Sequence, residues 1–489
     1  MNRVSFILKD ATRAMTVFPL LLCFCISGCM VGPDFTRSEP AVPDTWVDAN
    51  AESATQPAAA EAALQEWWTV FNDAKLTALV QEAFQSNLDL QIATTRIRQA
   101  RASRGIARSG IGPTVDASGS FRRSQAASGG SGMKSPTVNN YQAGFDAGWE
   151  IDIFGGVRRG IEAADAQLQA TVENRRDILV TLAAEVARNY IELRTYQQRL
   201  AIARKNLKTQ EHSAELTRKR FEGGFVSGLD VANADAQVAT TEAQVPLLES
   251  AARQTTYALS VLVGREPGAL VSDLSETVAM PLVPPAAPIG VPSDLLRRRP
   301  DILLAEADIH AATANIGVAK ADLYPRVTIN ASIGWNSGNS GDLFNSLSRF
   351  WSFGPSVSWN LFQTGRTLSN VELRKALQDE FILAYRKTVL TAIQEVENAL
   401  VASTKEQEHR KSLQAAVVAN RKAAKLATEL YTQGHTGFLN VLSAQRALYS
   451  SEDSLAQSNQ AMAVQLITLY KALGGGWEEV QTAARGQER

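Results

Sequence analysis

An internal repeat constrains the fold of this chain more than any other sequence feature, because both halves must adopt one plan. The stretch Tyr431–Ala444 aligns without a gap with Phe221–Ala234, at an offset of 210 residues. In each copy, glycines interrupt a long helical pattern that restarts a few residues later. Each stretch therefore predicts a tight turn between two helices. The aligned pairs include Gly224/Gly434, Leu229/Leu439, Asp230/Asn440 and Val231/Val441.

The duplication extends over nearly the whole chain after its N-terminal segment. Trp149 matches Trp359, and Glu185 matches Glu395, at the same offset. Together with changes in composition, these matches predict how the chain is divided. We expect a signal peptide (1–28), an extended leader rich in Pro and Ala (29–62), a first repeat (63–265), a linker (266–292), a second repeat (293–475) and a C-terminal tail (476–489).

The N-terminal segment predicts export and a lipid anchor. Arg3 and Lys9 precede the apolar run Val17–Ile26, which is too short to span a bilayer and is typical of a secretory signal. The run ends in Ile-Ser-Gly-Cys29, which resembles a bacterial lipoprotein box. Cys29 would then become the lipidated N-terminus, and its acyl chains would anchor the protein to a membrane. An ordinary signal peptide cleaved nearby is the alternative.

Composition argues against several classes of function. Lys and Arg together number 49 against 50 Asp and Glu, so nucleic acid is not an expected partner. The four histidines are scattered and form no ligand-like pair, so we expect no metal site. No nucleophile elbow or phosphate-binding loop is present, so we do not expect an enzyme. All three cysteines precede residue 30, which leaves no disulfide in the mature chain.

Alternating apolar and polar residues predict two strands in each repeat. The alternation covers about 111–122 and 141–154 in the first repeat, and about 325–335 and 351–362 in the second. Four strands cannot close a barrel, and open sheet edges are not viable in lipid. A trimer with twelve strands would solve this problem. The alternative is an ordinary soluble sheet in each half.

A long helix follows each predicted hairpin. The first begins near Val157, and apolar residues recur every seven positions up to Phe221, which predicts coiled-coil packing. Its return helix is predicted over Leu229–Leu262. The second long helix runs from about Thr367 to Tyr431. Small residues beside the apolar stripe would let such helices pack side by side into a cylinder; a plain antiparallel coiled coil is the alternative.

The lipoprotein box, the duplicated helix–β-hairpin–long helix–turn–helix plan and the two Gly-x4-Leu-Asp/Asn-Val turns together resemble the TolC-type outer-membrane efflux channel family, in its lipoprotein branch. The resemblance covers about residues 29–475. It implies a mainly α fold with a β-barrel part, in which a homotrimer forms a twelve-stranded transmembrane β-barrel and a periplasmic α-helical barrel. It also implies the outer membrane of a Gram-negative bacterium, with covalent lipid on Cys29 and no other cofactor.

The same resemblance implies an exit duct that passes small molecules and performs no catalysis. The implied partners are two further copies of the chain, a periplasmic adaptor (membrane fusion) protein, an inner-membrane pump of the RND type, and outer-membrane lipid. The alternative function is a lipid-anchored coiled-coil periplasmic adaptor or scaffold protein. The alternating hairpins argue against that alternative, because an adaptor needs compact lipoyl-like and barrel modules.

The resemblance also assigns roles to the two repeated turns. Channels of the family close at a periplasmic tip, in part through a Tyr–Asp link, which carries over to Tyr431 and Asp230. Thr436 stands where a second link would use an arginine, and Asn440 and Ser443 stand where carboxylates often line the narrowest point. The predicted gate is therefore Asp230, Asn233, Tyr431, Asn440 and Ser443. Helix capping is an alternative role for Asp230 and Asn233.

The tips of the same turns are the expected docking site for the adaptor. The residues concerned are the glycines and small polar residues at which the chain reverses. They are Gly224, Ser227 and Gly228 in the first turn, and Gly434, Thr436 and Gly437 in the second.

Overall fold

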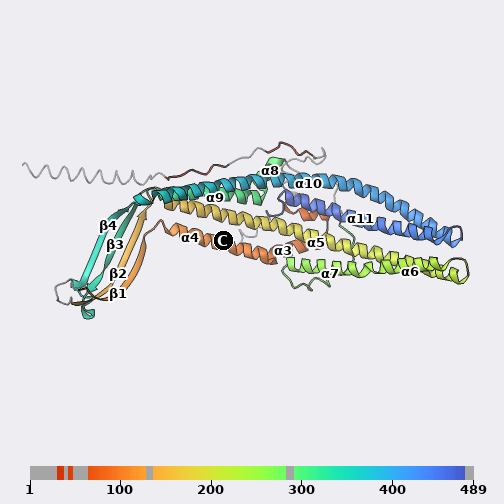
Figure 1. The fold of residues 1–489 in the computed structure, drawn as a ribbon, viewed down its shortest axis with the longest axis horizontal. Helices are drawn as coiled ribbons and strands as arrows, with labels where there is room; N and C mark the ends of the chain where they lie inside the picture. The colour runs from red at the N-terminus through yellow and green to blue at the C-terminus, as the bar shows by residue number, and fades with distance from the viewer. Residues whose placement is uncertain (1–29, 38–41, 48–63, 128–135, 282–290, 479–489) are drawn as a thin grey trace, which may run out of the picture. The chain divides into compact units, whose positions relative to one another are not determined.

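The computed structural model describes residues 30–37, 42–47, 64–127, 136–281 and 291–478 of the chain. The predicted signal peptide and the predicted lipidation site Cys29 lie outside these residues. Long helices and one sheet make up most of the described chain (Figure 1). Contacts between residues divide the chain into two units, which we describe separately. Among the described residues, no helix is both long enough and apolar enough to cross a membrane.

The first unit contains one antiparallel sheet to which both repeats contribute. β1 (Thr114–Gln125) pairs with β2 (Thr137–Ile151), and β3 (Arg326–Ser337) pairs with β4 (Arg349–Ser358). β2 also pairs with β3, so the order is β1-β2-β3-β4 and the two hairpins form a single sheet. The prediction of a mainly helical fold with a small β part is confirmed.

The strands of the first hairpin differ by a few residues from the predicted ranges 111–122 and 141–154. β1 begins only at Thr114, because Pro113 has no backbone N–H for a sheet hydrogen bond. Pairing continues to Gln125 opposite Thr137, so the loop between the strands is shorter than expected. β2 ends at Ile151, before the segment that leads into the next helix.

The second hairpin differs from the predicted ranges 325–335 and 351–362 at both ends, since β3 continues to Ser337 and β4 begins at Arg349. β4 already ends at Ser358, because the 3-10 turn η4 (Leu361–Gln363) begins shortly afterwards. The connection from β3 to β4 contains two more short turns, η2 (Ser340–Asp342) and η3 (Ser346–Ser348).

The two faces of the sheet differ in chemistry, as the alternation of the sequence predicts. On one face Phe145 lies opposite Ala117 and Ile333. On the other face Asp146 lies opposite Asp116. The apolar face is uncovered in one protomer, and a surface of this kind marks a site that contacts lipid or protein. Its exposed side chains are Val115, Phe121, Phe145, Trp149, Ile333, Trp351, Phe353 and Val357.

The leader residues 30–37 dock on the first unit. Gly32, at φ +105°, approaches Gly317 so closely that an added Cβ would lie 2.5 Å from the Gly317 Cα. Asp34 accepts a hydrogen bond from Arg159 at 2.6 Å, and the Arg159 side chain is only 2% exposed. This part of the predicted extended leader is therefore held in place by specific contacts with both repeats.

The helices follow the duplicated plan. α5 (Gly156–Glu222) and α10 (Thr364–Thr432) are the long helices predicted to follow the hairpins. The remaining helices, together with the 3-10 turn η1, precede the hairpins or return from the turns. They are η1 (Trp67–Phe71), α3 (Ala74–Ser86), α4 (Leu88–Ser109), α6 (Gly228–Glu242), α7 (Gln244–Leu262), α8 (Pro292–Arg298), α9 (Pro300–Ala321) and α11 (Phe438–Ala472).

The first return segment is two helices, α6 and α7, rather than the single helix Leu229–Leu262 predicted from periodicity. Pro246 has no backbone N–H to donate to the Glu242 carbonyl, and its ring crowds that carbonyl. The helix therefore breaks after Glu242. Ala456 occupies the matching position in the second repeat, where α11 continues without a break.

Aromatic side chains form much of the core of the second unit. Trp67 is fully buried and stacks on Tyr470, with 5.4 Å between the ring centroids. Trp68, also fully buried, packs edge-on against Phe84 at 5.5 Å. Burial raises the pKa of Tyr470 to about 12, so this hydroxyl stays neutral at ordinary pH.

In both repeats of the second unit, an equivalent hydrogen bond joins the residue before an entering helix to the end of the returning helix. In the first, the Asn87 side chain donates to the Leu262 carbonyl at the end of α7, at 2.9 Å. In the second, Arg299 donates to the Ala472 carbonyl at the end of α11, at 2.8 Å. A residue at the start of an entering helix thus binds an otherwise unpaired carbonyl at the end of the returning helix.

We expect Gly264→Ala to destabilise the protein by roughly 2 kcal/mol or more, because the substitution forces a strained backbone and a clash. Gly264 has φ +71°, and an added Cβ would overlap the Ser86 carbonyl oxygen. Gly268→Ala is the matched control, since nothing lies within 4 Å of a Cβ there. Thermal unfolding of the two purified variants checks this expectation, and equal melting temperatures would contradict it.

Candidate functional site

The turn between α5 and α6 is set by a glycine in the left-handed region. Gly224 has φ +74°. Its N–H donates to the Phe221 carbonyl at 2.9 Å, and the N–H of Phe225 donates to the Arg220 carbonyl at 2.8 Å. This is the Schellman arrangement, which satisfies the last carbonyls of a helix and strongly favours glycine at this position.

The turn between α10 and α11 has the same backbone geometry. Gly434 has φ +82°. Its N–H donates to the Tyr431 carbonyl at 3.0 Å, and the N–H of His435 donates to the Leu430 carbonyl at 2.9 Å. The structure therefore has a helix–turn–helix at both copies of the repeated stretch, closed by aligned glycines.

The two return helices begin differently. Ser227 caps α6: its N–H donates to the Asp230 carboxylate at 3.2 Å, and the Asp230 N–H donates to the Ser227 hydroxyl at 3.4 Å. Gly437, which aligns with Ser227, has no side chain to cap α11. Asn440 instead donates to the Thr436 hydroxyl at 2.6 Å. Asp230 therefore caps a helix, as the alternative role predicts, and its role in a gate stays a prediction compatible with capping.

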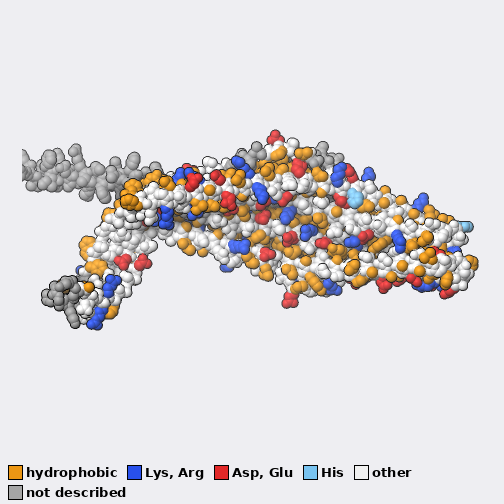
Figure 2. All heavy atoms as spheres, viewed as in Figure 1, with side chains coloured by type: hydrophobic (Ala, Val, Ile, Leu, Met, Phe, Trp, Pro, Cys, Tyr) orange, Lys and Arg blue, Asp and Glu red, His pale blue; other side chains and the backbone are white. Residues whose placement is uncertain are grey.

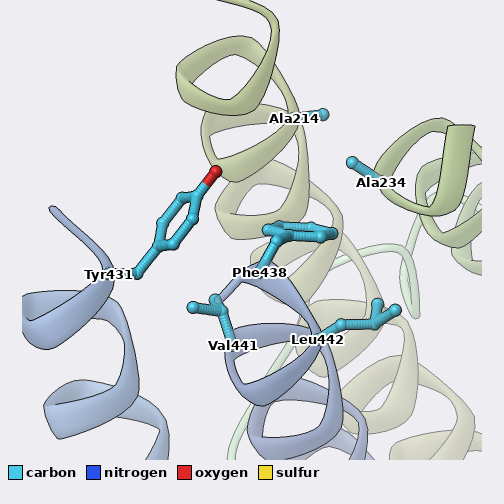
Figure 3. Close-up of a cluster of buried hydrophobic side chains, with 6 residues drawn as sticks. All are labelled: Ala214, Ala234, Tyr431, Phe438, Val441 and Leu442. Carbon is cyan, nitrogen blue, oxygen red and sulfur yellow. The ribbon is translucent and has the colours of Figure 1, made fainter. Parts of the chain in front are cut away.

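A buried hydrophobic cluster joins the four helices close to the turns (Figure 3). The rings of Tyr431 and Phe438 meet edge-on, with centroids 5.7 Å apart. Each large side chain buried here stabilises the fold by about 1.5–3 kcal/mol. The cluster consists of Ala214 from α5, Ala234 from α6, Tyr431 from α10, and Phe438, Val441 and Leu442 from α11.

Tyr431 is the polar link between this cluster and α5. Its side chain is almost fully buried, and its hydroxyl donates to Thr217 at 3.1 Å. The Arg220 guanidinium lies 4.6 Å from the centre of the Tyr431 ring and donates to the Tyr431 carbonyl. Within one protomer, the structure does not bring Tyr431 and Asp230 into a hydrogen bond.

Sequence reasoning did not single out Thr217 or Arg220. Both precede the first turn on a surface of α5 that the heptad pattern does not mark. They contact Tyr431 only because α10 packs beside α5, and no local pattern in the sequence indicates which helix packs there.

The other predicted gate residues lie apart from the buried cluster. Asn440 and Ser443 are exposed, and Asn233 is half-buried on α6. Among the predicted docking residues Thr436 is half-buried and the rest are exposed, namely Gly224, Ser227, Gly228, Gly434 and Gly437. The surface of the tip is therefore open to a partner.

Apolar side chains at the first turn are a further feature that sequence reasoning missed. Phe225 is 76% exposed and Leu229 is 67% exposed. The position that aligns with Phe225 is His435 in the second turn. Phe225 thus gives the first turn an exposed apolar ring where the second turn has the polar imidazole of His435, and this difference is visible once the two repeats are aligned.

Ion pairs near the turns are exposed and local. Arg218 of α5 pairs with Asp235 of α6 at 2.9 Å. Lys219 donates to Glu215 one helical turn earlier at 2.7 Å, which lowers the pKa of the Glu215 carboxyl. Among the described residues, no group of three or more His, Cys, Asp or Glu side chains is placed to hold a metal.

A model of the outer membrane efflux protein family matches residues 79–265 and 291–475 of the chain. The chain is 33% identical to the outer membrane protein OprJ of Pseudomonas aeruginosa, over 95% of this chain and 97% of that protein. It is 32% identical to nodulation protein T of Rhizobium leguminosarum bv. trifolii, over 96% and 99% of the two chains.

The solved structure of the outer-membrane channel OprN superimposes on this protein with a TM-score of 0.86 and 35% sequence identity. The match covers 92% of this chain and 100% of OprN. OprJ is thus an outer membrane protein and OprN an outer-membrane channel. The chain therefore belongs to the outer membrane efflux protein family, the outer-membrane channels of efflux systems in Gram-negative bacteria.

Proposed function

We propose that three copies of this chain form a continuous exit duct, with a twelve-stranded β-barrel in the membrane and a helical barrel in the periplasm. The observation that carries this proposal is the sheet. β1 and β4 each pair on one side only, which leaves two free edges per protomer. One face is apolar and the other polar, as lipid outside and water inside a closed barrel require. Closure through β1 and β4 of neighbouring copies satisfies both edges.

Lipid on Cys29 would tether each protomer to the same membrane. The neighbouring residue Met30 packs against Gly155, where the chain passes from β2 to α5. The residue that follows the predicted lipidation site thus lies close to the end of the sheet, where a membrane surface is expected. Stable anchoring needs more than one acyl chain, as a lipidated N-terminal cysteine would supply.

One experiment tests the trimer and the anchor together. We expect cells labelled with radioactive palmitate to yield an outer-membrane band of trimer mass on an unheated denaturing gel, with the label in that band. Cys29→Ser should abolish the label. A labelled monomer band would refute the trimer, and label retained in Cys29→Ser would refute lipidation at this residue.

The duct would work in a tripartite system with a periplasmic adaptor and an inner-membrane pump of the RND type. We propose that the adaptor docks on the two turns. The exposed Phe225 and Leu229 support this role, because exposed rings and aliphatic side chains anchor protein interfaces.

We expect Phe225→Ser to weaken binding of the adaptor by about tenfold, since losing one buried aromatic anchor costs at least about 1.4 kcal/mol. The matched control is His435→Ser, at the aligned position of the second turn. Binding of the purified adaptor to immobilised channel measures both. Equal affinities of the two variants would contradict the docking role of the first turn.

We further propose that the tip is the gate of the duct. Asp230, Asn233, Asn440 and Ser443 would line the closing helices, and Tyr431 would hold α10 against α5. The hydrogen bond between Tyr431 and Thr217 supports this role of Tyr431, because it joins the pair α10–α11 to the pair α5–α6 within a protomer. The Asp230 carboxylate would contact a neighbouring protomer at the tip and so help to hold the duct closed.

Asp230→Asn should raise the single-channel conductance in planar bilayers, because it removes the carboxylate charge at the tip while an amide oxygen can still cap α6. Ser227→Ala is the matched control, since it removes the capping hydroxyl and keeps the charge. Conductance that rises equally in both variants would assign Asp230 to capping alone.

Tyr431→Phe should also raise conductance, through loss of the Thr217 hydrogen bond.

A further inference from the structure

A polar cavity of about 530 Å³ lies within the first unit, where the sheet meets α10. It is bordered by the residues that follow α9, by the end of β4 and by the first turn of α10. Asp322, Arg326, Asn360, Gln363, Arg366 and Asn370 are among the residues that line it. The cavity lies at the end of β4, whose free edge closes the proposed trimer, and the duct function described above assigns no ligand to it.

The cavity carries one positive charge, that of Arg366, which no described residue compensates through an ion pair. Arg326 pairs with Asp322 at 2.5 Å, so these two charges cancel. Among the residues that the structure describes, no carboxylate pairs with Arg366. The amides of Asn360, Gln363 and Asn370 add further donors. The lining therefore suits a ligand with one negative charge and several acceptor oxygens, such as a phosphodiester.

The first repeat supplies its own anion at the matching place. Asp152, at the end of β2, accepts hydrogen bonds from the backbone N–H groups of Val157 at 3.2 Å and Arg158 at 2.9 Å. In the second repeat Phe362 aligns with Asp152, and Arg366 aligns with Gly156. The second junction has thus lost the Asp152–Arg158 ion pair, since Leu368 aligns with Arg158, and it carries Arg366 without a matching carboxylate. This leaves room for an anion from outside the chain.

Exposed apolar side chains flank the same cavity. Phe362 is fully exposed and Leu361 is 58% exposed, although both belong to the turn η4 beside the lining residues. Trp359 donates its ring N–H to the Leu323 carbonyl at 3.1 Å and leaves the ring 56% exposed. Hydrophobic side chains gather where the sheet meets the helices (Figure 2). Trp at the end of a strand is typical of a membrane–water interface.

We propose that the cavity binds the phosphate of a phospholipid in the periplasm-facing leaflet of the outer membrane. Arg366 and the amide side chains hold the phosphate, and Phe362 and Leu361 contact the acyl chains. The charged Arg366 matches the phosphate of a phospholipid, and the apolar Phe362 and Leu361 beside it match the acyl chains. A free anion would need only the charged group. The inference rests on the proposed membrane orientation of the duct.

The test uses the purified full-length channel in detergent, titrated with dihexanoylphosphatidylglycerol. We expect Arg366→Gln to weaken binding about tenfold, the typical effect of losing one charge-assisted hydrogen bond. Arg366→Lys should keep most of the affinity. Arg386→Gln, an exposed arginine further along α10, is the matched control and should bind as the unchanged protein does. Phe362→Ser should also weaken binding, through loss of acyl contact.

Two further probes separate the sources of affinity. Dihexanoylglycerol, which has no phosphate, and inorganic phosphate alone should each bind much more weakly than the phospholipid. Equal binding of inorganic phosphate, or no effect of Arg366→Gln, overturns the lipid site. Single-channel conductance separates a failure of the lipid site from a failure of the duct. If the channels conduct but do not prefer the phospholipid, only the lipid site is rejected. If the unchanged protein does not conduct, the duct is rejected.

Discussion

The backbone pairing of β2 with β3 is the interaction on which the rest of the structure depends. It joins a strand from each repeat, with Ala147 opposite Ala331, and so turns two separate hairpins into one sheet. The register keeps apolar residues on one face, because a slip of one residue would exchange the faces. Two free edges remain, at β1 and β4, and their unpaired backbone groups make further copies of the chain necessary in a membrane.

Duplication preserved the backbone of the two turns but not their side chains. Gly224 and Gly434 adopt the same left-handed conformation, since only glycine does so without strain. Ser227 and Gly437, by contrast, give one capped and one uncapped helix start. The same holds at the other end of the long helices, where Asp152 is replaced by Phe362. A symmetrical scaffold thus carries sites that differ between its two halves.

The candidate site could be located from the sequence, but its contacts could not. The aligned glycines mark both turns, because a positive φ is a local requirement. The partner of Tyr431 is different in kind: Thr217 is 214 residues away in the chain, and the contact exists only because α10 packs beside α5. The resemblance to a known family implies a gate link between Tyr431 and Asp230, which stays a prediction, and the structure adds that Tyr431 belongs to a buried cluster of one protomer.

By itself, the sequence determined the features that depend on neighbouring residues. These are the alternation of the strands, the glycine turns and the break that Pro246 causes in the first return helix, although periodicity alone missed that break. Tertiary structure alone decided which distant segments meet: β2 with β3, and the leader residue Gly32 with Gly317. The physical reason is that φ, ψ and periodicity depend on neighbouring residues. Which segments pack together depends instead on how well distant surfaces of similar chemistry fit one another.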